Sequence, residues 1–283
     1  VYPTSVDGFT VTNAYEPEKT QVTVNALWDD ENDQDGKRPE SVTVHLLANG
    51  EKIATQIITA ETGWTFTFAD LDVCANGEHI VYSIMVDSLD AYTSSVDGFT
   101  VTNTYDPEKT QITVNALWQD QNDQDGKRPA SLTVVLLADG KKIASQTITA
   151  EMGWMYTFSS LDKFTDGKQI VYTVTVDAPE GYTVSVDGFT VTNTHIPEKT
   201  QISVDAVWVD ANNQDGKRPA SIAVDLQANG MKVQTAILTA ANGWKVTFGD
   251  LDQYENGRQI IYTISQAQVA GYSSAVSDYT ITY

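Results

Sequence analysis

An acidic loop that recurs three times is the part of the sequence best suited to chemistry. Its first copy, Asp29–Gly36, places carboxylates at alternating positions before a glycine, as calcium-binding loops do. The candidate ligands are Asp30, Asn32, Asp33 and Asp35. The bidentate glutamate of an EF-hand is missing, and the copies at 119–126 and 209–216 are less acidic. The shared residues favour an Asx-rich turn with no cofactor, and calcium in the first copy is kept as the alternative.

Cysteine and histidine supply no site that all copies share. Cys74 is the only cysteine, so the chain can form neither an internal disulfide nor a cysteine metal site. Its counterparts are Phe164 and Tyr254, and we therefore expect an apolar packing position. None of the histidines has a histidine counterpart in another copy; they are His45, His79 and His195. A shared triad or zinc site is excluded, and with no recurring acid–base pair we expect no enzyme.

Tryptophan recurs twice in each copy. The six are Trp28, Trp64, Trp118, Trp154, Trp208 and Trp244. A sugar-binding platform is one interpretation, but each tryptophan lies in an alternating, strand-like segment, which favours core packing. The basic pair Lys37-Arg38 that follows the acidic loop is expected to pair with local carboxylates.

The acidic loop and both tryptophans return every 90 residues. A period of this length makes the repeating unit a whole domain rather than a solenoid turn. Ser-Val-Asp-Gly-Phe-Thr-Val-Thr-Asn begins at Ser5, Ser95 and Ser185. Pro-Glu-Lys-Thr-Gln begins at Pro17, Pro107 and Pro197. We expect a terminal strand of a preceding repeat at 1–15, docked on a sheet edge of this or a neighbouring molecule, and three repeats at 16–105, 106–195 and 196–283.

Within one repeat, period-2 alternation predicts β-strands. Val22, Val24 and Ala26 fall on one face of a strand, and Asn49-Gly50 is a type I′ hairpin signal between two further strands. Six or seven short strands per repeat are typical of an all-β, immunoglobulin-like antiparallel sandwich. Short linkers that contain proline join the repeats, so the sequence predicts an elongated rod and a monomer.

The formal net charge of −21 is distributed over all three repeats. Such a surface disfavours nucleic acid and anionic lipid as partners. No apolar run approaches the ~20 residues of a membrane span, so we expect no membrane segment.

The run Trp28–Pro39, Trp-Asp-Asp-Glu-Asn-Asp-Gln-Asp-Gly-Lys-Arg-Pro, resembles the Cna protein B-type domain, and so do its copies at Trp118 and Trp208. The resemblance covers essentially the whole chain. It implies a prealbumin-like, Greek-key sandwich of the kind repeated in the stalks of Gram-positive surface adhesins and pilins.

Many members of that family form a Lys–Asn isopeptide bond between their first and last strands, assisted by a buried acid. The resemblance assigns the lysine, acid and asparagine positions to Ala26, Val86 and Asn103; Ala116, Val176 and Asn193; Ala206, Gln266 and Tyr283. Only the asparagine survives, in two repeats, so we expect no cross-link. Asn103 and Asn193 are expected to cap neighbouring backbone instead.

The resulting functional expectation is a stalk or spacer of a secreted, cell-wall-anchored adhesin, holding a functional tip away from the wall. Its partners would be the neighbouring repeats of the same chain. The alternative is a multivalent binding module for a host or bacterial surface ligand. Positions that differ between copies, such as Glu31, Gln121 and Ala211, disfavour three copies of one binding site.

Overall fold

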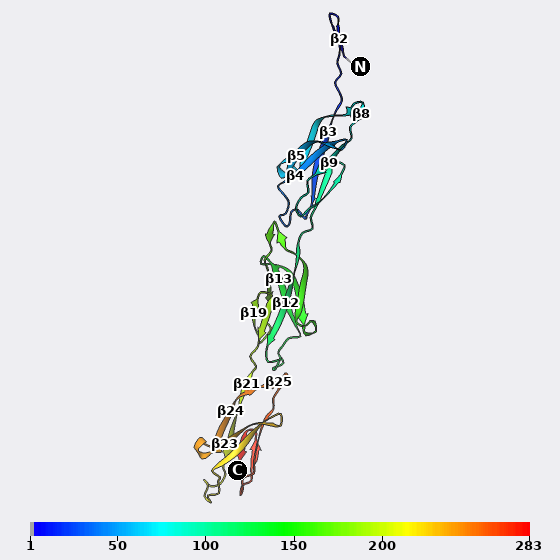
Figure 1. Ribbon diagram of the computed structural model, residues 1–283. Helices are drawn as coiled ribbons and strands as arrows, with labels where there is room; N and C mark the ends of the chain where they lie inside the picture. Colours follow the sequence, from blue (N-terminus) through cyan, green and yellow to red (C-terminus); the bar gives the residue numbers. More distant parts are fainter. Residues whose placement is uncertain (1–2) are drawn as a thin grey trace. The chain divides into compact units, whose positions relative to one another are not determined.

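The computed structural model describes residues 3–283, and these residues are almost entirely β-structure (Figure 1). Three similar sandwiches, here called repeats 1 to 3, follow one another along the sequence. The predicted all-β class with three immunoglobulin-like sandwiches is therefore confirmed.

Repeat 1 is a four-stranded sheet packed on a three-stranded sheet. Its strands are β3 (Lys19–Asp29), β4 (Ser41–Ala48), β5 (Glu51–Thr59), β6 (Thr65–Asp72), β7 (Cys74–Ala75), β8 (Glu78–His79), β9 (Tyr82–Val86), β10 (Thr93–Asp97) and β11 (Thr100–Thr104). The sheets run β10-β11-β3-β6 and β5-β4-β9, and β7 pairs with β8 in a small separate hairpin. A 3₁₀ turn, η1 (Ala60–Thr62), connects β5 to β6.

Repeats 2 and 3 follow the same plan. Repeat 2 contains β12 (Lys109–Gln119), β13 (Ser131–Ala138), β14 (Lys141–Thr149), η2 (Ala150–Met152), β15 (Met155–Asp162), β16 (Phe164–Thr165), β17 (Lys168–Gln169), β18 (Tyr172–Val176), β19 (Thr183–Asp187) and β20 (Thr190–Thr194). Repeat 3 contains β21 (Lys199–Val207), β22 (Ser221–Ala228), β23 (Met231–Thr239), η3 (Ala240–Asn242), β24 (Lys245–Asp252), β25 (Tyr254–Glu255), β26 (Arg258–Gln259), β27 (Tyr262–Gln266), β28 (Ala275–Ser277) and β29 (Thr280–Thr282).

The core of each repeat follows the predicted alternation. On β3, Val22, Val24 and Ala26 are buried, whereas the intervening Thr23 and Asn25 are exposed. Complete burial of a side chain such as Val24 stabilises the fold by about 2 kcal/mol. The inward faces of both sheets contribute in the same way, and one apolar cluster fills the space between them in repeat 1.

The predicted hairpin turn is also confirmed. Asn49 and Gly50 both have positive φ, 52° and 86°, as a type I′ turn requires. The turn joins β4 to β5 and so fixes their register.

One pairing in each repeat is parallel, although the sequence predicted antiparallel strands. The first strand β3 lies beside the last strand β11, with Ala26 opposite Val101 and Trp28 opposite Asn103. The two strands run in the same direction because the chain enters each sandwich at one end and leaves it at the other. This pairing joins the first and the last strand of a repeat by hydrogen bonds.

The segment before repeat 1 differs from the prediction. It forms a hairpin of two short strands, β1 (Thr4–Asp7) and β2 (Thr10–Asn13), rather than one strand. The two strands pair only with each other, and residues 3–13 are exposed, so the hairpin docks on no sheet edge within the described part of this chain. Docking on a neighbouring molecule stays a prediction. The edge of β3 that such a hairpin would join is already occupied by β11. The call for 1–15 includes residues 1 and 2, which lie outside the described residues.

The described chain forms two compact units whose boundary falls inside repeat 2. One unit contains the residues up to Gln111 together with Phe158–Val171, and the other contains Ile112–Thr157 with Tyr172–Tyr283. The hairpin β16–β17 of repeat 2 therefore belongs to the same compact unit as repeat 1.

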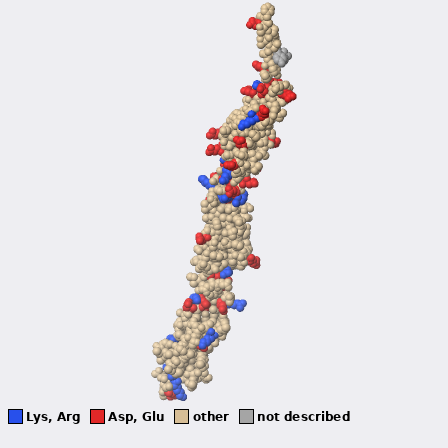
Figure 2. All heavy atoms as spheres, in the orientation of Figure 1, with Lys and Arg blue, Asp and Glu red and all other residues tan. Residues whose placement is uncertain are grey.

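Acidic side chains are present on all three repeats on the face drawn in Figure 2. None of the helices in residues 3–283 is long and apolar enough to cross a membrane.

Candidate functional site: the joints between repeats

The positions that the resemblance assigns to an isopeptide bond in repeat 1 lie on its two facing sheets. Ala26 is buried on β3, and Asn103 is fully buried on the neighbouring β11. Val86 is half-buried on β9 of the opposite sheet. Asn103 Nδ2 donates to the Leu27 carbonyl at 3.4 Å, as expected for a backbone cap, and its Oδ1 accepts from Ser94 Oγ at 2.6 Å.

The same positions diverge in the other repeats. Asn193 donates to the Leu117 carbonyl at 3.2 Å, but its Oδ1 is buried without a partner because Val184 replaces Ser94. In repeat 3, Tyr283 occupies the asparagine position and stacks on Trp208, with ring centroids 4.5 Å apart. Four further positions are apolar or uncharged and are buried or half-buried: Ala116, Val176, Ala206 and Gln266.

The acidic loop is organised around a buried ion pair. Asp30 is 2% exposed and receives two guanidinium hydrogen bonds from Arg38, at 2.6 and 3.0 Å. The Tyr92 hydroxyl donates to the same carboxylate at 2.9 Å. Burial alone would raise the pKa of Asp30, but these donors and the Asp33 amide outweigh it and lower the pKa.

The equivalent pairs in the later repeats have nearly identical geometry. Arg128 donates to Asp120 and Arg218 donates to Asp210, each at 2.6 Å through Nη2. Burial opposes ionisation of Asp120, but its donors prevail and lower its pKa to about 2. This pair is therefore a constant element of the fold, and the prediction that the basic residue pairs locally is confirmed for Arg38.

The four calcium candidates have separate roles. Asp30 binds Arg38, Asp33 Oδ1 accepts from the Arg38 amide at 2.8 Å, and Asp35 points towards the next repeat. Asn32 is exposed. In the described residues, no group of three or more His, Cys, Asp or Glu side chains is arranged to hold a metal. The geometry is that of a turn closed by an ion pair.

The tryptophans pack at one end of the core, as predicted. Trp28 meets Trp64 and Tyr92 edge-on, with ring centroids 4.8 and 5.2 Å apart. Arg38 lies over the Trp28 ring at 5.1 Å, which adds a cation–π contact to its ion pair.

The last acidic residue of the loop holds the linker to the following repeat. Asp35 Oδ2 accepts hydrogen bonds from the Tyr105 hydroxyl at 2.8 Å and the Glu108 amide at 2.7 Å. Burial and the hydrogen bond to Asp35 raise the pKa of Tyr105 to about 12. We call this arrangement, together with the hairpin contact described next, joint 1.

A hairpin of repeat 2 lies against the same loop. The Gly167 amide, at the tip of β16–β17, donates to the Gln34 carbonyl at 3.0 Å. The backbones approach so closely that a Cβ on Gly36 would lie 2.7 Å from Gly167 Cα. Only glycine fits this position, because its φ of 66° also disfavours other residues. The linker is held further by the ion pair between Glu108 and Lys163, at 2.6 Å.

Joint 2 repeats this arrangement with two changes of chemistry, of which the first is the ion pair of the linker glutamate: Glu198 pairs with Lys127 of the loop rather than with a hairpin lysine. Asp125 accepts from the Glu198 amide at 2.7 Å, and His195 replaces the tyrosine, with Nε2 2.9 Å from Asp125 Oδ2. The Gly257 amide donates to the Gln124 carbonyl at 3.0 Å. Burial would lower the pKa of His195, but the hydrogen bonds to Asp125 and to the Gly181 carbonyl outweigh it and raise the pKa.

Cys74 lies on the hairpin of repeat 1 that corresponds to the joint hairpins of repeats 2 and 3. The sequence predicted an apolar packing position, and this is wrong: Cys74 is exposed on β7. Its counterparts Phe164 and Tyr254 are half-buried in hairpins that contact the preceding repeat, whereas nothing lies within 4 Å of a Cβ placed on Gly77. The position is therefore a joint residue rather than a core residue.

Sequence reasoning located the residues of the joints but not their role. The acidic loop, the Pro-Glu-Lys-Thr linker and the Tyr105/His195 alternation were each visible, yet they were treated separately. The loop aspartate and the linker residues that it binds are about 70 residues apart in sequence. The signal that could have linked them is that the loop, the linker and the Tyr105/His195 position all recur every 90 residues.

Comparison with known proteins agrees with this architecture. The Cna protein B-type domain model matches residues 22–104, 112–194 and 202–283. The collagen adhesin of Staphylococcus aureus is 42% identical over 99% of this chain, which spans 25% of that relative's length.

Two solved structures of a collagen-binding protein from S. aureus are also similar. The crystal structure of two B repeat units of the collagen-binding protein of S. aureus has a TM-score of 0.60 and 38% identity, covering 99% of this chain and 79% of that one. The structure of a single B repeat unit is 40% identical, with a TM-score of 0.31, and covers 64% of this chain and all of that one. These relatives are adhesin repeat domains rather than enzymes. This chain, with its three tandem sandwiches, belongs to the Cna protein B-type domain family.

Proposed function

We propose that the chain is a spacer segment of a Gram-positive cell-wall-anchored adhesin, and that its repeats carry no intramolecular isopeptide bond. The observation that carries this proposal is the pair of joints, in which a buried aspartate holds the linker of the next repeat. Such joints suit a spacer, because they hold the start of each repeat against the end of the repeat before it. We retain boundaries at 16–105, 106–195 and 196–283, with 1–15 as the end of a preceding repeat.

The absence of cross-links is supported by the residues at the three bond positions. Ala26, Ala116 and Ala206 supply no amine nucleophile. The linker lysines are engaged elsewhere, as in the Lys19–Asp72 ion pair at 2.6 Å. The intact mass of the native chain should equal the sum of its residues, and a mass lower by one ammonia would contradict the proposal.

Ligand binding is proposed to lie outside these repeats. A relative is named a collagen adhesin, so fibrillar collagen is the probe of choice. We expect no saturable binding of the isolated chain to immobilised collagen. Saturable binding that is lost on mutation of equivalent residues in all three repeats would favour the multivalent binding module instead.

A further inference from the structure

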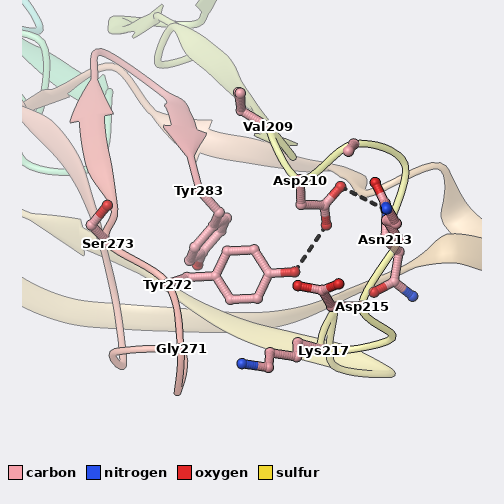
Figure 3. A pocket seen from close by; sticks show the side chains of 11 residues that line it. Val209, Asp210, Asn213, Asp215, Lys217, Gly271, Tyr272, Ser273 and Tyr283 are labelled. Atoms are coloured by element: carbon pink, nitrogen blue, oxygen red, sulfur yellow. Dashed lines mark hydrogen bonds between the residues drawn. The ribbon is translucent and has the colours of Figure 1, made fainter.

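A pocket of about 660 Å³ opens at the loop end of repeat 3. Its walls are the acidic loop from Val209 to Lys217, the Gly271–Ser273 turn and Tyr283. Figure 3 shows the Asp215 and Lys217 side chains beside the Tyr272 ring, with Asp210 fixed by Tyr272 and the Asn213 amide. The pocket is mostly polar, so a polar segment is the suitable occupant.

The pocket residues are the counterparts of the residues that hold the next repeat in joints 1 and 2. Asp215 corresponds to Asp35 and Asp125, and Gly216 corresponds to the two glycines at the close backbone contacts. Lys217 corresponds to Lys127, which forms an ion pair with the linker residue Glu198 in joint 2; in joint 1 the linker glutamate pairs with Lys163 of the hairpin instead. In repeat 3 these groups lie open: Asp215 is exposed, whereas Asp125 is 6% exposed.

The open loop already has the conformation of the occupied loops. In repeat 1, Glu31, Asn32 and Asp33 have φ angles of 51°, 61° and 60°. The corresponding angles at Ala211, Asn212 and Asn213 are 50°, 59° and 62°. The Asp210–Arg218 ion pair that braces the loop is also formed, at 2.6 Å. An occupant would therefore bind with little cost of ordering the loop.

We propose that this pocket is a docking surface for the leading end of another repeat of the same kind, carried in continuation of Tyr283. Three features would make the fit. A tyrosine hydroxyl or histidine N–H, two residues beyond position 283, donates to Asp215. The main-chain N–H of a Pro-Glu-Lys segment donates to the same carboxylate, while its glutamate pairs with Lys217, as in joint 2, or with a lysine of its own hairpin, as in joint 1. A glycine-tipped hairpin lies against Gly216.

The third feature is the most selective, because it excludes a side chain on both partners. A Cβ on Gly126 would lie 2.6 Å from Gly257 Cα, whereas a Cβ on Gly216 meets nothing within 4 Å. All three glycines at this loop position have nearly the same φ, 66°, 67° and 63°. An alanine would therefore cause similar backbone strain in the three loops. A difference in its effect between an occupied and an open loop would measure the close contact with the next repeat. The proposal holds whether the repeats act as a spacer or bind a ligand.

The test compares the native chain with a chain extended after Tyr283 by a copy of residues 104–193. Amide hydrogen exchange of the 210–217 loop is measured in both. We expect exchange at the Gly216 loop to slow at least ~10-fold in the extended chain, to the rates of the loops in joints 1 and 2. Gly216→Ala should abolish this protection in the extended chain, and its effect on the same loop in the native chain measures the contribution of backbone strain alone.

A control places the alanine on the other partner. Gly167→Ala within the copied repeat should remove the same protection, although it lies in a different sandwich. Equal loop exchange in native and extended chains would overturn the proposal. Protection that persists with both alanine variants would also overturn it, since the added repeat would then be ordering the loop without docking as joints 1 and 2 do.

Discussion

At the residue scale, the geometry of His195 defines its charge state in joint 2. Nδ1 lies 2.7 Å from the Gly181 carbonyl and Nε2 lies 2.9 Å from an Asp125 carboxylate oxygen. Both partners are acceptors, so both ring nitrogens must donate, which requires the imidazolium form. Tyr105 in joint 1 needs no charge to donate to Asp35.

Joint 2 should therefore respond to pH near neutrality, unlike joint 1. Since the pKa of His195 is raised on folding, its stabilisation is complete below the unfolded value of about 6.5 and is lost as pH rises through the folded pKa. NMR spectra recorded from pH 5 to 9 should show the Glu198 amide shifting with His195, and the Glu108 amide should stay constant. His195→Tyr should remove the response. A shift of equal size at both amides would show that the histidine is not its source.

A single buried oxygen distinguishes the ends of repeats 1 and 2. Asn193 Oδ1 has no partner, whereas its counterpart Asn103 accepts from Ser94. Val184→Ser should supply that donor and stabilise repeat 2 by about 1 kcal/mol, because an unsatisfied buried acceptor costs about 1–3 kcal/mol. The reciprocal Ser94→Val should destabilise repeat 1 by a similar amount. Thermal unfolding of the two variants gives the comparison, and changes of the same sign would contradict this account.

At the element scale, strands and turns were predictable because their causes are local. Alternation in β3 and the Asn49-Gly50 pair act within a few residues, so the sequence alone carries them. The parallel β3–β11 pair and the joint hairpins depend on partners far apart in sequence. Cys74 illustrates the limit: its exposure depends on whether a loop of another repeat covers its hairpin, which residue type does not encode.

The joint hairpins offer a matched pair of glycines. Gly167 and Gly77 have φ of 71° and 84°, but a Cβ on Gly167 would lie 3.2 Å from Gly36 Cα, and one on Gly77 would meet nothing within 4 Å. Gly167→Ala should therefore accelerate exchange of its own amide, which donates to Gln34, several-fold more than Gly77→Ala accelerates exchange in its hairpin. If the two substitutions had equal effects, backbone strain alone would explain both, and the contact would not stabilise joint 1.

At the scale of the whole molecule, the fold is the same in the three repeats although the residues at the assigned cross-link positions differ. All three repeats keep the sandwich and the Asp–Arg pair, and the two joints share their aspartate and glycine contacts. The positions assigned to the bond change from Ala26, Val86 and Asn103 to Ala206, Gln266 and Tyr283. The sandwich is thus retained while these positions vary, and each repeat can be tested for its capacity to form the bond. Repeat 1 retains the amide, and repeat 3 does not.

Restoring the missing groups should re-create the cross-link in repeat 1 only. Ala26→Lys combined with Val86→Glu would put an amine on β3 and an acid on β9 near Asn103. The amine nitrogen can then bond to the side-chain amide carbon Cγ of Asn103 as the Cγ–Nδ2 bond breaks and Nδ2 leaves as ammonia. Either substitution alone should destabilise repeat 1, because it buries an unpaired ionisable group.

The double variant should lose one ammonia in its intact mass and gain stability by about 3–5 kcal/mol, as closure of a long loop does. Ala206→Lys with Gln266→Glu in repeat 3 is the control and should keep its full mass, because Tyr283 has no amide. A folded repeat 1 double variant of unchanged mass would mean that the three side chains no longer converge. The bond would then have been lost from the geometry of the repeat as well as from its residue types, and substitution at two positions would not suffice to recover it.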